Sequence, residues 1–165
     1  MTSMNKVRRR LTGLFTITLA MLFTAALVAA PAHATYGPPQ PVDLNLRGTS
    51  STGLITPVGR LVGSVQFDDG NSYYRLDAIA CRQSSYVEPT IKIDVNGALH
   101  QWFSSSDGIR RPEVCGGHGM SGAVNVEFAY SGIIYNIKVT YEGLYFEGST
   151  AKPISKSRTY DNPFN

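Results

Sequence analysis

Apolar and polar side chains alternate residue by residue through most of this chain, and this pattern constrains its fold more than any other. In the clearest case, Ile91, Ile93 and Val95 alternate with Lys92 and Asp94. Successive side chains of a strand point to opposite sides, so such alternation is typical of a strand with one buried face. Taken along the chain, the pattern predicts short strands at 42–46, 61–67, 73–81, 91–95, 99–103, 124–130, 135–141 and 144–146.

Turn residues separate these segments and predict how they connect. Asn96-Gly97 favours a type I′ hairpin turn, because both central positions of that turn need a positive φ. Asp68-Asp69-Gly70-Asn71 predicts another turn. Outside the first 34 residues no window has a sustained apolar period of 3.6 residues. Seven to eight short strands joined in this way predict an all-β protein, an antiparallel β-sandwich, with a partly closed β-barrel as the alternative.

The first 34 residues have a different composition and indicate export. Lys6 and the run 8–10 (Arg-Arg-Arg) precede an apolar stretch at 11–30, and Ala32-His33-Ala34 follows. A basic segment, an apolar segment and small residues at the two cleavage positions are typical of a secretory signal peptide. We therefore predict cleavage after Ala34 and a secreted, extracellular protein with no stable membrane anchoring in its mature form.

Removal of residues 1–34 changes the charge and defines the expected domain organisation. The chain has 15 basic and 12 acidic residues; four of the basic ones and no acidic ones precede Thr35, which leaves a formal net charge of −1. This balance gives no electrostatic footprint for nucleic acid. We predict an extended Pro-rich segment at 35–41, a single β-domain at 42–147, and an irregular C-terminal tail at 148–165.

The two cysteines, Cys81 and Cys115, predict a disulfide in an exported protein. Their separation of 34 residues corresponds to roughly 3–4 kcal/mol of stabilisation in the chain-entropy model.

Cys115 opens a glycine-rich segment, 115–122. Such a segment can form an anion-binding nest of backbone amides. It lacks the spacing of a phosphate-binding loop, so we interpret it as a loop pinned by the disulfide.

Four side chains are the candidate ligand-binding residues: Trp102 and His100, with Tyr86 and His118 as weaker additions. His100 and Trp102 are two residues apart on one predicted strand, so we expect them to share a face opposite Leu99. An outward Trp102 would offer an apolar platform suited to stacking on a sugar ring or a partner side chain. The alternative is that Trp102, the only tryptophan, belongs to the core.

No grouping of acids, bases or metal ligands gives a specific catalytic signal, so we predict no catalytic residues, metal or cofactor. Asp68, Asp69, Asn71 and Asp77 lack the spacing of an EF-hand loop. The favoured function is non-catalytic binding of an extracellular glycan, protein or cell-wall component.

Two alternatives remain open for the function. The first is a small hydrolase that uses His118 or His100 with a carboxylate, or Ser121 and His118 with Asp107. The second is a protease inhibitor that presents 104–112 or 84–89 as a rigid exposed loop.

Overall fold

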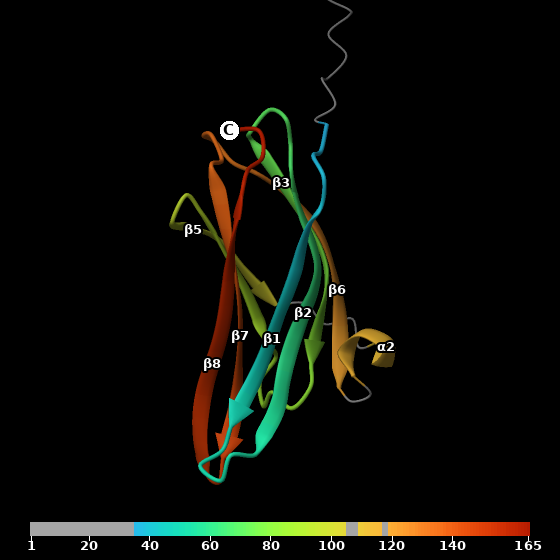
Figure 1. Cartoon of the computed structure of the whole chain (residues 1–165), viewed down its shortest axis with the longest axis vertical. Helices are drawn as coiled ribbons and strands as arrows, with labels where there is room; N and C mark the ends of the chain where they lie inside the picture. The colour runs from blue at the N-terminus through green and yellow to red at the C-terminus, as the bar shows by residue number, and fades with distance from the viewer. Residues whose placement is uncertain (1–34, 105–108, 117–118) are drawn as a thin grey trace, which may run out of the picture. The chain divides into compact units, whose positions relative to one another are not determined.

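The computed structural model describes residues 35–104, 109–116 and 119–165, which form two four-stranded antiparallel sheets (Figure 1). One sheet has the order β1-β2-β3-β6 and the other the order β5-β4-β7-β8. The β-sandwich prediction is confirmed. The strands are β1 (Gln40–Thr49), β2 (Ile55–Phe67), β3 (Tyr73–Arg82), β4 (Thr90–Val95), β5 (Ala98–Ser104), β6 (Met120–Ala129), β7 (Asn136–Glu147) and β8 (Thr150–Asp161).

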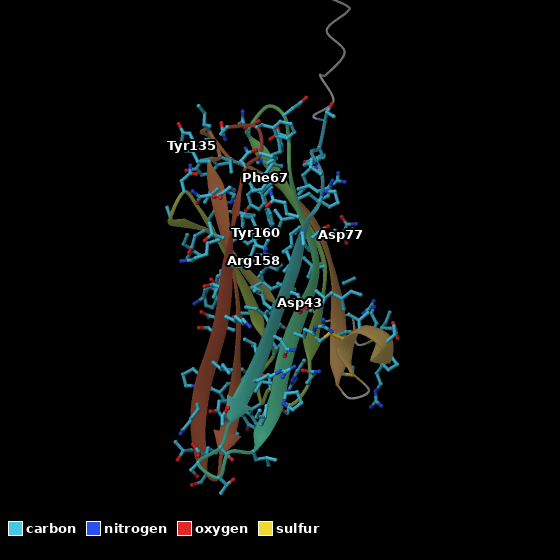
Figure 2. All side chains as sticks on the ribbon, viewed as in Figure 1. Asp43, Phe67, Asp77, Tyr135, Arg158 and Tyr160 are labelled. Carbon is cyan, nitrogen blue, oxygen red and sulfur yellow. A yellow bond between two sulfur atoms is a disulfide. The ribbon has the colours of Figure 1, made fainter. Side chains whose placement is uncertain are left out.

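The core lies between the two sheets and is built from the inward face of each strand. Ile91, Ile93 and Val95 of β4 are fully buried, as their alternation predicts. Figure 2 shows Phe67 and Tyr160 between the layers, and both are almost fully buried. The Tyr141 hydroxyl donates a 2.9 Å hydrogen bond to the Cys81 carbonyl, which joins the second sheet to the first. This bond satisfies a polar group that would otherwise be costly to bury.

Both predicted hairpin turns are present. Asn96 and Gly97 have φ values of 51° and 85°, as a type I′ turn requires. In the β2–β3 turn, the Asp68 carboxylate accepts hydrogen bonds from the backbone N–H groups of Ser72 (2.8 Å) and Tyr73 (2.7 Å). Asp68 is only 2% exposed. Its carboxylate therefore organises the turn that joins these two strands.

The disulfide Cys81–Cys115 is formed and covers part of the outer face of the first sheet. Cys81 points away from the core, and Cys115 ends a single helical turn, α2 (Pro112–Cys115), packed over it. The Gln83 side-chain amide donates to the Cys115 carbonyl at 2.6 Å, and Arg60 donates to the Val114 carbonyl at 3.3 Å. The loop that contains Cys115 is therefore held by hydrogen bonds as well as by the covalent bond.

The predicted irregular tail is wrong, because residues 150–161 form β8 and pair with β7 along twelve positions. The β-domain therefore extends past 147. Strand β8 lies at a sheet edge, and most of its side chains are exposed; only Ile154 and Tyr160 give a weak apolar signal. Asn162, just beyond it, donates from its side-chain amide to Asn71 and to the Ile134 carbonyl, both at 2.8 Å.

The predicted Pro-rich segment 35–41 is also partly ordered by pairing. Strand β1 begins at Gln40, and Tyr36 forms an isolated antiparallel bridge with Asp68. Residues 1–34 lie outside the described residues, so the signal peptide remains a prediction. In the described part of the chain, no helix has the length and apolar character needed to cross a membrane.

Candidate functional site

A β-bulge in β5 separates the two strongest candidate residues. Gln101 pairs with Ile93 and Leu99 pairs with Asp94, which leaves His100 without a partner on β4. An extra residue of this kind bends a strand and changes which side chains share a face. The expectation that His100 and Trp102 lie on one face is therefore wrong: His100 turns toward the interior, and Trp102 faces outward.

Trp102 is exposed on the outer face of the second sheet, so the alternative that it belongs to the core is wrong. Its side chain is 66% exposed. Its neighbour across the strand pair is Lys92, which lies between the buried Ile91 and Ile93 and so also points outward. The Lys92 ammonium lies 5.8 Å from the centroid of a Trp102 ring. The indole is therefore held beside a cation at the sheet edge.

Charged and hydroxyl side chains continue this outer face across the sheet. Lys92 forms a 2.8 Å ion pair with Glu142, and Lys138 forms a 2.7 Å ion pair with Asp94. Thr140 pairs with Lys92 and also with Ser157, which carries the polar row on to β8. The tryptophan thus lies beside hydrogen-bonding groups that belong to rigid strands.

A shallow groove of about 350 Å³ lies on the same sheet, next to Glu142. The segment before β4 forms one side and β8 forms the other. The lining residues are Val87, Glu88, Thr90, Glu142, Gly143, Leu144, Pro153, Ile154 and Ser155. Glu142 lines the groove and also binds Lys92, so the groove and the Trp102 neighbourhood are continuous.

A second exposed aromatic group lies beyond the groove. Tyr86, 66% exposed, makes an edge-to-face contact with Phe146 on β7, with ring centroids 4.9 Å apart. The Tyr86 backbone N–H donates to the Leu144 carbonyl at 2.8 Å. Thr140 lies in the same cross-strand row as Lys92 and Trp102. Phe146 is six positions further along β7, which corresponds to roughly 20 Å along the strand. We call this surface, from Trp102 through the groove to Tyr86 and Phe146, the Trp102 face.

His100 lies in an aromatic cluster between the sheets and does not contribute to the Trp102 face. Its Nδ1 atom is 2.8 Å from the Tyr74 hydroxyl. The rings of Phe128 and Tyr130 make edge-to-face contacts with it at 6.2 Å and 5.5 Å. Burial raises the pKa of the Tyr74 hydroxyl well above its usual value, so this group stays protonated and can donate to a neutral imidazole. The phenol therefore fixes the orientation of the His100 ring.

Among the residues of the hydrolase alternative, the structure describes Ser121 and His100. Ser121 is 1% exposed; its hydroxyl donates to the Ile109 carbonyl and accepts a 2.7 Å hydrogen bond from Arg111. It is therefore a buried structural hydroxyl. His118 and Asp107 lie outside the described residues, so their proposed roles stay predictions.

Three carbonyl groups of the loop 84–89 already accept hydrogen bonds from side chains. Arg82 donates to the carbonyls of Ser85 (2.8 Å) and Tyr86 (2.7 Å), and the Ser85 hydroxyl donates to that of Val87 (2.6 Å). A substrate-like inhibitor must offer a carbonyl oxygen to the oxyanion hole of the protease. The carbonyl groups of Ser85, Tyr86 and Val87 are therefore held within the loop, and Val87 and Glu88 also line the groove. The other candidate loop, 104–112, includes residues that the structure does not describe.

Among residues 35–104, 109–116 and 119–165, no group of three or more His, Cys, Asp or Glu side chains is arranged to hold a metal ion. The sequence did not identify Glu142, Phe146 or the groove as parts of a site. The available signal was the pair Tyr145-Phe146, which must place one ring on each face of its strand.

Comparisons of the chain with protein-family models, curated proteins and solved structures returned no match.

Proposed function

We propose that this chain is a secreted, non-catalytic module that binds an extended extracellular glycan along the Trp102 face. The observation that carries the proposal is the placement of two exposed aromatic groups on either side of a groove on one sheet face. The groove is lined by both apolar and polar side chains. Sugar rings have apolar C–H faces that pack on aromatic rings, and their hydroxyl groups suit the Lys, Glu, Thr and Ser side chains between them. Binding groups on strands are already ordered, which reduces the entropic cost of association.

Secretion is the second part of the proposal. Its support is the signal-like segment 1–34 together with a disulfide, since disulfides persist in oxidising compartments. We expect the exported protein to begin at Thr35, and its intact mass measures this directly. A mature form that retains 11–30 would contradict the proposal.

Trp102→Ala is expected to weaken glycan binding by about 30-fold, as for an aromatic residue that supplies much of the binding energy of an interface. The probes are soluble β-1,4-linked glucose, xylose and N-acetylglucosamine oligomers, from dimers to hexamers, measured by calorimetry. Because the side chain is largely exposed, the free energy of unfolding should change by less than about 1 kcal/mol.

Tyr135→Ala is the matched control, because Tyr135 is also an exposed aromatic residue but lies at one end of the sandwich (Figure 2). Tyr135→Ala should bind like the wild type.

Phe146→Ala should weaken binding of the longer oligomers more than that of the dimers. Full binding by Trp102→Ala, or a panel without any saturable ligand, would overturn the proposal. A loss of about 3–5 kcal/mol of stability in Trp102→Ala would show a structural role instead.

A further inference from the structure

A second groove lies where the edge strands of the two sheets meet. Strands β1 and β8 run along the same side of the sandwich, and the Gln40 side-chain amide donates to the Asp161 carbonyl at 2.7 Å. Figure 2 shows Asp43 and Arg158 on these neighbouring strands. The groove has a volume of about 460 Å³ and is lined by Asn45, Leu46, Arg47, Ile154, Ser155 and Lys156. We call it the seam groove.

Cations approach the seam groove from both sheets. Lys156 and Arg158 point to the same side of β8. They pair with Tyr141 and Val139 of β7, which face inward, so both side chains extend toward β1. They are about 7 Å apart along the strand. Arg47 lines the groove from β1. The Arg158 guanidinium lies 5.4 Å from the Tyr160 ring centroid, a contact that restricts its position.

An acidic residue on β1 that interacts with Lys156 already has a partner. Asp43 on β1 forms a two-point ion pair with Arg60, at 2.9 Å and 2.8 Å. The Arg60 guanidinium holds the pKa of the Asp43 carboxyl below its usual value, and Lys156 adds a smaller effect in the same direction. Glu147, near the start of β8, is paired with Lys152. The described residues at the seam therefore leave a net positive charge in a domain whose overall formal charge is −1.

Protection of the sheet edge explains part of this pattern. Lysine and arginine on an edge strand discourage pairing with another chain. Protection of the sheet edge requires charge on β8. It does not require a groove, or a cation on β1 that faces the same groove. The convergence of Arg47 with Lys156 at the seam groove, with Asn45 and Ser155 as hydrogen-bonding neighbours, is typical of a site for an anion.

We propose that the seam groove binds a linear polymer with regularly spaced anionic groups. Arginine forms paired hydrogen bonds with carboxylate, sulfate or phosphate oxygens, and lysine adds a point charge. Cations spaced along β8 suit charges repeated along a chain. The seam groove shares Ile154 and Ser155 with the groove of the Trp102 face. Its cations do not belong to that face, so the two proposals can fail separately.

The test is the binding of three polyanions to the full mature protein at low salt. The probes are dextran sulfate, polygalacturonate and polyphosphate, with neutral dextran as the uncharged reference, and the comparison among them identifies the preferred anionic group. Saturable binding to at least one polyanion is expected, with affinity that falls as salt screens the charges. Lys156→Gln combined with Arg158→Gln should weaken it about tenfold or more.

The matched control removes the same two charges elsewhere. Arg75→Gln combined with Lys138→Gln changes surface pairs on the outer faces of the two sheets and should keep the affinity within about twofold of the wild type. Equal losses in the two double variants would show that net charge alone governs binding, and would overturn the seam site. Absence of binding to all three polyanions would also overturn it. Circular dichroism confirms that each variant is folded.

Discussion

Gly63→Ala is expected to lower the free energy of unfolding by about 3 kcal/mol or more. Gly63 lies in the middle of β2, directly opposite Ala78 of β3. A Cβ atom at this position would lie 2.1 Å from the Asp77 carbonyl oxygen and 2.4 Å from the Ala78 Cα. These are backbone atoms of a neighbouring strand, which cannot move aside as the end of a long side chain can. The two central strands of the first sheet would have to separate.

Gly132→Ala is the matched control for this substitution. Its added methyl group would meet only the Tyr130 ring, with the nearest atom at 3.2 Å, and that ring can shift. We expect this variant to remain within about 1 kcal/mol of the wild type. Urea unfolding at equilibrium measures both variants. A Gly63→Ala protein as stable as the wild type would show that β2 and β3 can separate at little cost, contrary to this account of their packing.

The sequence predicts the fold well where a strand has one buried and one exposed face. Alternation at 91–95 identified β4, and Asn96-Gly97 identified the turn that follows it, because each signal depends only on local chemistry. The pairing of Cys81 with Cys115 follows from composition alone. Strand β8 was missed because an edge strand with two exposed faces needs no apolar alternation.

The candidate site is harder to predict, since it depends on register and on contacts between distant segments. A single unpaired residue in β5 places His100 and Trp102 on different faces, and no residue type in that segment indicates a bulge. In the sequence, Tyr86 stands as an isolated aromatic residue. Its contact with Phe146, sixty positions along the chain, arises only when the segment before β4 packs beside β7.

Replacing both cysteines by alanine is expected to lower the free energy of unfolding by about 3–4 kcal/mol. The bond closes a loop of 34 residues, so its removal returns entropy to the unfolded chain. Alanine is preferred to serine here because both cysteines are buried, and a serine hydroxyl would lack a partner. Thermal and urea unfolding measure the change, and thiol titration of the wild type establishes the starting state. Two free thiols in the native wild type would contradict the prediction.

The location of the disulfide makes this variant informative about the Trp102 face as well. Cys81 lies on the outer side of the first sheet under α2, whereas Trp102 lies on the outer side of the second sheet. Under conditions where the double alanine variant is folded, its glycan affinity should therefore match that of the wild type. Hydrogen exchange should instead increase at 111–116, where hydrogen bonds to Gln83, Arg60 and Ser121 would hold the chain without the covalent bond. A fall in glycan affinity without unfolding would place the ligand near the disulfide and contradict binding along the Trp102 face.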